Sequence, residues 1–195
     1  MRVHRLIPIA ALALAVACSE DATSPTSIVK PQFAVAAGQY GTGALTNTTA
    51  AALPSGGHLQ SGTVFCVVGS DLSVTCSTGN YQINGIGNTN ATADLSATYE
   101  ATVDCTNRGG NLVEVKSQAT GAGDTDVTFK SKNGALTVTP ITASTPTDAA
   151  FEASATCPNG NWRKSVAPGD PTLVSFTYTL TFAGFSTPTV TIAAQ

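Results

Sequence analysis

The chain has 195 residues, of which only 11% are charged, with nine Lys and Arg against twelve Asp and Glu. This acidic balance, without any cluster of basic residues, argues against a nucleic-acid partner. The length suits one domain with a single core and leaves little room for two.

The chain begins with a positively charged segment followed by a short apolar run, the order found in export signals. Arg2 and Arg5 precede "LIPIAALALAVA", which covers residues 6–17. A run of this length matches the hydrophobic region of a signal peptide but falls short of the ~20 residues that cross a membrane. We therefore expect residues 1–17 to be a signal peptide. Ala15 and Ala17 also fit ordinary secretory cleavage.

The segment "LAVAC", residues 14–18, resembles the lipobox of bacterial lipoproteins, although Ala15 stands where that family most often has Leu. The resemblance implies that Cys18 becomes the first residue, is acylated and attaches the protein to a membrane. Ser19 implies the outer membrane by the family's sorting rule. Removal of Cys18 from five cysteines also leaves the even number that disulfides require. The expected location is the bacterial cell envelope, at its periplasmic face or at the cell surface.

The polar segment "SEDATSPTSIVKPQ" contains two prolines and shows no hydrophobic period, so residues 18–32 are expected to form a lipidated, disordered tether. Loss of Arg2 and Arg5 leaves seven basic against twelve acidic side chains. Residues 33–195 are expected to form a single domain. Within it, residues 33–62 are expected to be partly irregular, with an edge strand near residues 33–37.

From about residue 63 onward, apolar residues recur with a period of two, which is typical of half-buried strands. The pattern runs from Ala93 to Cys105 in "TADLSATYEATVDC" and from Val174 to Phe182 in "LVSFTYTLTF". "FEASATC" alternates in the same way from Phe151, and no segment shows a helical period. These patterns predict an all-β fold, an immunoglobulin-like β-sandwich of about seven to nine strands, with a small closed β-barrel as the alternative.

Two segments predict hairpins. "VTFKSKNGALTVT" has the Asn-Gly pair at 133–134, a strong hairpin pattern. "CVVGSDLSVTC" predicts a second hairpin, in which Cys66 lies opposite Cys76 and Val68 lies opposite Val74.

The cysteines that follow Cys18 are expected to form structural disulfides. The hairpin register brings Cys66 and Cys76 within bonding distance. Cys105 and Cys157 each end an alternating segment on its apolar side. We therefore predict the disulfides Cys66–Cys76 and Cys105–Cys157. Zinc binding is not expected, because the cysteines lack the spacing of zinc ligands.

Two turns rich in Asn and Gly begin at the last of these cysteines: "CTNRGGN" at residues 105–111 and "CPNGNW" at residues 157–162. The pair resembles motifs of uncharacterised secreted bacterial proteins of the β-sandwich type, over about residues 90–195, and this resemblance implies a fold but no activity. A bond between Cys105 and Cys157 would place the turns side by side. The predicted ligand contacts are Asn107, Arg108, Asn111, Asn159, Asn161, Trp162 and Arg163.

Trp162 allows two interpretations. If it is exposed, it can stack on a sugar ring or anchor a protein partner. If it folds back over the disulfide, it belongs to the core, and the Asn and Gly residues serve only the turn geometry.

Candidates for catalysis or metal binding are few. His58, in "SGGHLQSG", has no nucleophile motif beside it and is expected to be a solvated loop residue. Asp104 and Glu114 are a weak paired-carboxylate candidate. Asp124 and Asp126 in "GAGDTD" are a weak Ca²⁺ candidate, because the segment lacks further oxygen ligands. We expect no cofactor, no metal and no enzyme activity.

The sequence thus predicts a lipid-anchored binding module without catalysis. Its expected partners are the membrane, through the lipid anchor, and a glycan or protein ligand. The alternative is a structural envelope or assembly subunit that acts through strand edges, and a hydrolase is the third hypothesis.

Overall fold

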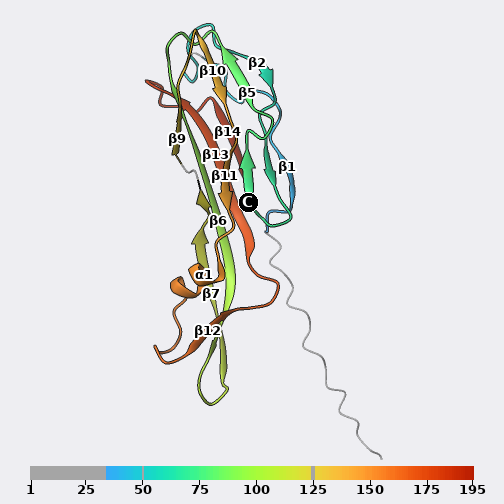
Figure 1. The fold of residues 1–195 in the computed structure, drawn as a ribbon, viewed down its shortest axis with the longest axis vertical. Coiled ribbons are helices and arrows are strands. Elements are labelled where there is room, and N and C mark those ends of the chain that lie inside the picture. The colour runs from blue at the N-terminus through green and yellow to red at the C-terminus, as the bar shows by residue number, and fades with distance from the viewer. Residues whose placement is uncertain (1–33, 50, 124–125) are drawn as a thin grey trace, which may run out of the picture. The chain divides into compact units, whose positions relative to one another are not determined.

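A computed structural model describes residues 34–49, 51–123 and 126–195, and this part of the chain is built mainly from antiparallel strands (Figure 1). The predicted signal peptide, the tether, Cys18 and Asp124 lie outside the described residues. The division of the chain at residues 17 and 32 therefore stays a prediction. Within the described ranges, no helix combines the length and the apolar character that a membrane span needs.

The first sheet holds the predicted cysteine hairpin near its centre. Its strand order is β1-β3-β4-β11-β8. The strands are β1 (Gly38–Tyr40), β3 (Cys66–Val68), β4 (Val74–Cys76), β8 (Ala122–Gly123) and β11 (Ile141–Ser144). In the hairpin, Cys66 lies opposite Cys76 and Val68 lies opposite Val74, so the predicted register is confirmed.

The second sheet has the order β10-β5-β2, with β2 at His58–Gly62, β5 at Tyr81–Asn84 and β10 at Ala135–Val138. The Asn-Gly turn at 133–134 forms as predicted, with positive φ angles of 53° and 78°. The predicted hairpin is wrong beyond this turn. The preceding strand, β9 (Asp126–Phe129), pairs with β6 (Ala91–Thr106) of the third sheet, whereas β10 pairs with β5.

The third sheet is built around β6 (Ala91–Thr106), the longest strand in Figure 1. Its strands follow the order β12-β6-β13-β14, in which β12 and β13 pair with different stretches of one edge of β6. β7 and β9 pair with the opposite edge of β6. The remaining strands are β7 (Leu112–Thr120), β12 (Arg163–Val166), β13 (Thr172–Phe182) and β14 (Val190–Ala194). The alternation predicted for β6 is confirmed, because every second residue from Ala93 to Cys105 is buried.

The predictions for two strands, β13 and β1, need correction. A bulge between Leu173 and Ser175 in β13 buries Leu173 and leaves Val174, predicted to point inward, half-buried. The edge strand expected near residues 33–37 is β1, which starts later. Val35 instead donates its backbone N–H to the Leu173 carbonyl of the third sheet at 2.8 Å, so the chain passes that sheet before it reaches the first.

Helix α1 (Asp148–Ser154) replaces the strand predicted for "FEASATC". Three of its seven residues are alanine, the strongest helix former, and Asp148 lies in the first turn, where the helix dipole favours an acid. Phe151 is its only buried residue. One buried position cannot produce a helical period, which is why the expectation that the domain has no helix is wrong.

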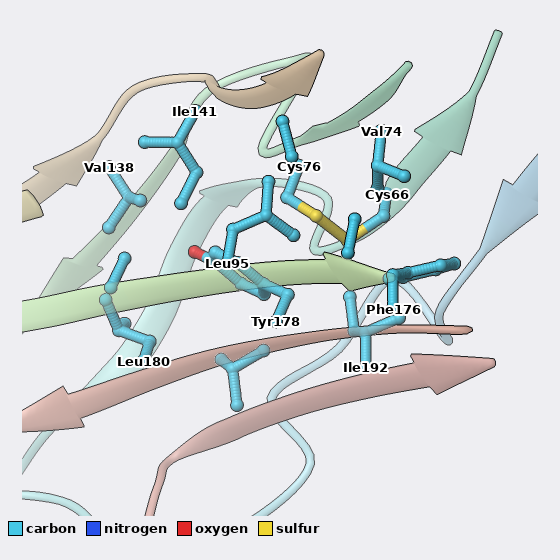
Figure 2. Close-up of a cluster of buried hydrophobic side chains, with 14 of the residues drawn as sticks. Cys66, Val74, Cys76, Leu95, Val138, Ile141, Phe176, Tyr178, Leu180 and Ile192 are labelled. Atoms are coloured by element: carbon cyan, nitrogen blue, oxygen red, sulfur yellow. A yellow bond between two sulfur atoms is a disulfide. The ribbon is translucent and has the colours of Figure 1, made fainter. Parts of the chain in front are cut away.

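The third sheet packs against the other two in a β-sandwich with one buried core. The Tyr40 ring of β1 contacts Phe176 of β13 edge to face, with ring centroids 5.3 Å apart. Figure 2 shows the Cys66–Cys76 disulfide within this core. All three sheets keep free edges, so the closed barrel is wrong. The described residues contain fourteen strands rather than about seven to nine, because several short strands lie between the long alternating ones.

A hydroxyl network fixes how the sheets meet. The Tyr178 hydroxyl of β13 lies 2.8 Å from the Tyr81 hydroxyl of β5 and 3.1 Å from Ser77 Oγ. Burial raises the pKa of Tyr81 well above its ordinary value and also raises the pKa of Tyr178. Both tyrosines therefore stay protonated. Because each hydroxyl group has a hydrogen-bond partner, burying it costs little free energy.

Candidate functional site

The predicted disulfide Cys105–Cys157 is present and ties two distant turns together. It joins the end of β6 to the segment after α1, with Cα atoms 5.8 Å apart. β12 then pairs with the same end of β6, so that Arg163 lies opposite Thr106. The bond and this pairing bring the β6–β7 turn and the α1–β12 turn to one end of the third sheet (Figure 1).

Asn107 organises the β6–β7 turn. Its Oδ1 accepts hydrogen bonds from the backbone N–H groups of Gly109, at 2.8 Å, and Asn111, at 2.9 Å. Gly110 has a φ angle of 81°, a left-handed conformation that favours glycine. Arg108 lies in this turn and is exposed.

Asn159 has the same role in the α1–β12 turn. Its Oδ1 accepts a hydrogen bond from the backbone N–H of Asn161 at 3.1 Å. Trp162 follows and is half-buried, and it does not belong to the buried core of the described residues. The side chains of Asn161 and Arg163 are exposed.

Two adjoining depressions lie between the turns. The larger, of about 480 Å³, is lined by Thr106, Asn107, Arg108, Asn161 and Arg163. The second, of about 380 Å³, is lined by Asn107, Arg108, Gly109, Asn159, Asn161 and Trp162. Since they share three residues, we treat them as one site and call it the twin-turn hollow.

The structure brings six of the seven predicted contact residues into the twin-turn hollow. Asn111 lines neither part, because its backbone closes the β6–β7 turn through both side-chain and main-chain bonds of Asn107. Thr106 was missed by the sequence reasoning. Its only indication in the sequence was its position between Cys105 and Asn107.

Two exposed apolar side chains beside the hollow were also missed. Leu112 and Val113 begin β7 and are 53% and 40% exposed. Leu112 lies opposite Thr106 in the sheet, and therefore in the same cross-strand row as Arg163. Side chains in one such row share a face of the sheet. The apolar Leu112 side chain therefore lies on the same face as Arg163, whereas Val113, opposite Cys105, points to the other face.

The lysines of the described residues either form contacts of their own or lie away from the twin-turn hollow. Lys116 Nζ lies 3.2 Å from Glu100 Oε1. Lys164 Nζ donates hydrogen bonds of 2.7 Å to two backbone carbonyls near the end of α1. Lys130 and Lys132 line a different hollow of about 510 Å³, beside the Asn-Gly turn. The twin-turn hollow thus holds both arginines of the described chain, and neither forms an ion pair there.

The carboxylate pair and the histidine do not form a reactive arrangement. Asp104 and Glu114 are cross-strand neighbours in β6 and β7, so the sheet does bring them together. Neither residue lines the twin-turn hollow. His58 begins β2 instead of lying in a loop, and its exposed ring contacts the Gly56 carbonyl at 2.9 Å.

The predicted Ca²⁺ pair is not tested as a pair, because only Asp126 is described. It is exposed in β9 and lies opposite Asp94 of β6. Among the described residues, no group of three or more His, Cys, Asp or Glu side chains is placed to hold a metal ion.

Comparison of the chain with protein-family models, with curated proteins and with solved structures finds no match. The chemistry of the twin-turn hollow therefore has to be inferred from its own side chains. They offer an aromatic ring, two guanidinium groups and amide groups, which suits reversible binding.

Proposed function

We propose that the protein is a non-catalytic binding module and that the twin-turn hollow takes its ligand. The observation that carries this proposal is the gathering of half-buried Trp162 with two exposed arginines in one hollow, by a disulfide and a strand pairing. Conformational entropy opposes such gathering of polar loops. A rigid scaffold that presents exposed loop residues is the usual arrangement of binding proteins.

Replacement of Trp162 by alanine is expected to weaken ligand binding by about tenfold or more, because aromatic anchors dominate binding energy. The probe is an array of immobilised glycans and peptides, incubated with the purified protein. Trp162→Phe is the matched control, since it keeps a stacking ring. The melting temperature of both variants should stay within about 2 °C of the wild type, because the side chain lies outside the core.

The opposite result would show that Trp162 is structural: a strongly lowered melting temperature with undiminished binding. Sedimentation of the same samples tests the assembly alternative. Self-association that rises with concentration and persists in Trp162→Ala would favour contacts through strand edges such as exposed β7.

We further propose that the module works outside the cytoplasm and is anchored at the outer membrane through acylated Cys18. The two disulfides support this location, because such bonds persist in oxidising compartments. The intact, non-reduced native protein is expected to lack residues 1–17 and to carry acyl chains on Cys18. Its mass should rise by four hydrogens on reduction of the two disulfides. A full-length mass with all five thiols free would contradict both the anchor and the location.

A further inference from the structure

The charge of the twin-turn hollow is positive and uncompensated. Arg108 and Arg163 line its larger part, and no residue that lines either part is acidic. The only ion pair among the described residues is made elsewhere, by Lys116 and Glu100. Two unpaired guanidinium groups in a chain of formal net charge −3 favour an anionic ligand, because their planar forks match carboxylate and other oxyanion groups.

Two of the three asparagine side chains that line the hollow, Asn107 and Asn159, are oriented as donors. The Oδ1 atoms of Asn107 and Asn159 accept backbone N–H groups of their own turns. Because those partners are donors, the atom facing them must be the oxygen, and each Nδ2 group is left for other contacts. The two guanidinium groups and these two amide N–H groups are donors, whereas the Asn161 amide and the Thr106 hydroxyl can both donate and accept, so donors outnumber acceptors in the lining. A ligand that fits them is rich in acceptor oxygens.

The aromatic ring and the size of the hollow indicate a sugar rather than a small ion. Trp162 is half-buried and lines the second part, where a ring can stack on it. The two parts, of about 480 and 380 Å³, fall within the range of small-molecule sites. A protein hot spot would instead need a desolvated apolar pocket, whereas polar side chains dominate this lining.

We propose that the ligand is an anionic polysaccharide, whose rings stack on Trp162 and whose carboxylate or sulfate groups pair with Arg108 and Arg163. This inference rests on the proposed function, because it names the ligand class of the same hollow. Asn107 and Asn159 donate their free amide N–H groups to ring and hydroxyl oxygens. A neutral glycan would leave both guanidinium groups without partners and binds more weakly.

The test measures binding of the purified protein to three immobilised polymers: polygalacturonate, dextran sulfate and unmodified dextran. The polygalacturonate and sulfate arms distinguish the two sources of negative charge. We expect binding to at least one charged polymer, none to dextran, and affinity that falls as salt increases. Arg108→Gln and Arg163→Gln should each raise the Kd by about tenfold, the scale of one charge-assisted contact.

The matched control is the double variant Lys130→Gln/Lys132→Gln, which removes two positive charges from the separate hollow beside the Asn-Gly turn. It should leave the Kd unchanged. An equal loss in this control would overturn the inference, because the attraction would then be diffuse or located elsewhere.

Two further outcomes separate this inference from the proposed function. Binding of dextran that is lost in Trp162→Ala but retained in both arginine variants would overturn the anionic ligand and keep the binding site. Binding of none of the three polymers, together with no Trp162-dependent partner on the array, would overturn both.

Discussion

Removal of the Cys105–Cys157 disulfide by a double alanine substitution is expected to lower the free energy of unfolding by roughly 4 kcal/mol. The bond spans 52 residues, and the entropy that a cross-link removes from the unfolded chain grows with the loop that it closes. Urea denaturation under non-reducing conditions measures the change. A double variant as stable as the wild type would show that β12 pairing and α1 packing hold this end of the sheet without the bond.

The hairpin disulfide provides the comparison. Cys66–Cys76 spans only 10 residues, and its chain-entropy contribution is roughly 3 kcal/mol, to which loss of buried sulfur adds. Both double variants should therefore be destabilised. Only Cys105→Ala/Cys157→Ala should also weaken ligand binding, because, of the two disulfides, only this one helps the β12–β6 pairing to position the twin-turn hollow. Equal binding losses in the two variants would instead indicate general loosening of the sandwich.

Local periodicity explains why the long strands and the disulfide of the Cys66–Cys76 hairpin could be predicted. In β6, the apolar positions include Leu95, Tyr99 and Val103, whose size makes burial on one face strongly favourable. Such a strand has only one register that buries its apolar face, because a slip of one residue exposes all of it. Cys66, Cys76 and Cys105 lie at or near the ends of strands and take their direction from them. Cys157 follows α1 instead, so the predicted bond to Cys105 is present although the strand expected to end at Cys157 is a helix.

Alanine explains why α1 could not be predicted. "FEASATC" alternates only through Phe151, Ala153, Ala155 and Cys157, and alanine fits a helix at least as well as a strand. The alternation therefore carried little information. In the structure Ala153 is exposed, and the Phe151 carbonyl accepts a hydrogen bond from Ser117 Oγ of β7 at 2.8 Å. This contact joins residues 34 positions apart in the sequence, so no local pattern could predict it.

The partner of a strand is likewise a non-local property. The Asn-Gly turn forms, since its φ angles depend only on the two residues within it. The strands on either side diverge because β6 is long enough to pair with β9 at one end and with β7 further along. A turn motif specifies the reversal of the chain but not how far the ladder continues.

The membership of the candidate site could be predicted, but its chemistry could not. Pairing the two cysteines was sufficient to place Asn107 beside Trp162. The net charge of the hollow depends on which basic side chains are free, and the sequence does not show this. In the structure, Lys116 pairs with Glu100, and Lys164 binds two backbone carbonyls. Likewise, the donor character of Asn159 became evident only when its oxygen was seen to accept a turn N–H. That the hollow is rich in free donors can therefore be seen only from the hydrogen bonds of the folded chain.

Gly85 marks a contact between two backbone segments on which the second sheet depends. β2 and β5 pair with His58 opposite Asn84, and the two segments continue side by side to Gly56 and Gly85. A Cβ atom at Gly85 would overlap the Gly56 carbonyl oxygen, which is backbone and cannot rotate away. Gly85→Ala is therefore expected to lower the free energy of unfolding by about 3 kcal/mol or more, a loss typical of severe steric conflict.

Gly87 is the matched control, two residues further along the chain. It has a positive φ angle of 61°, comparable with 77° at Gly85, but no atom lies within 4 Å of its added Cβ. Gly87→Ala carries only the strain of the left-handed conformation, roughly 1 kcal/mol. Urea denaturation of both variants separates conformational strain from steric overlap. Similar losses in the two variants would mean that the loop before β2 yields without cost. That outcome is not expected, because buried Leu53 belongs to the core just before this loop, and displacing Gly56 would draw it out.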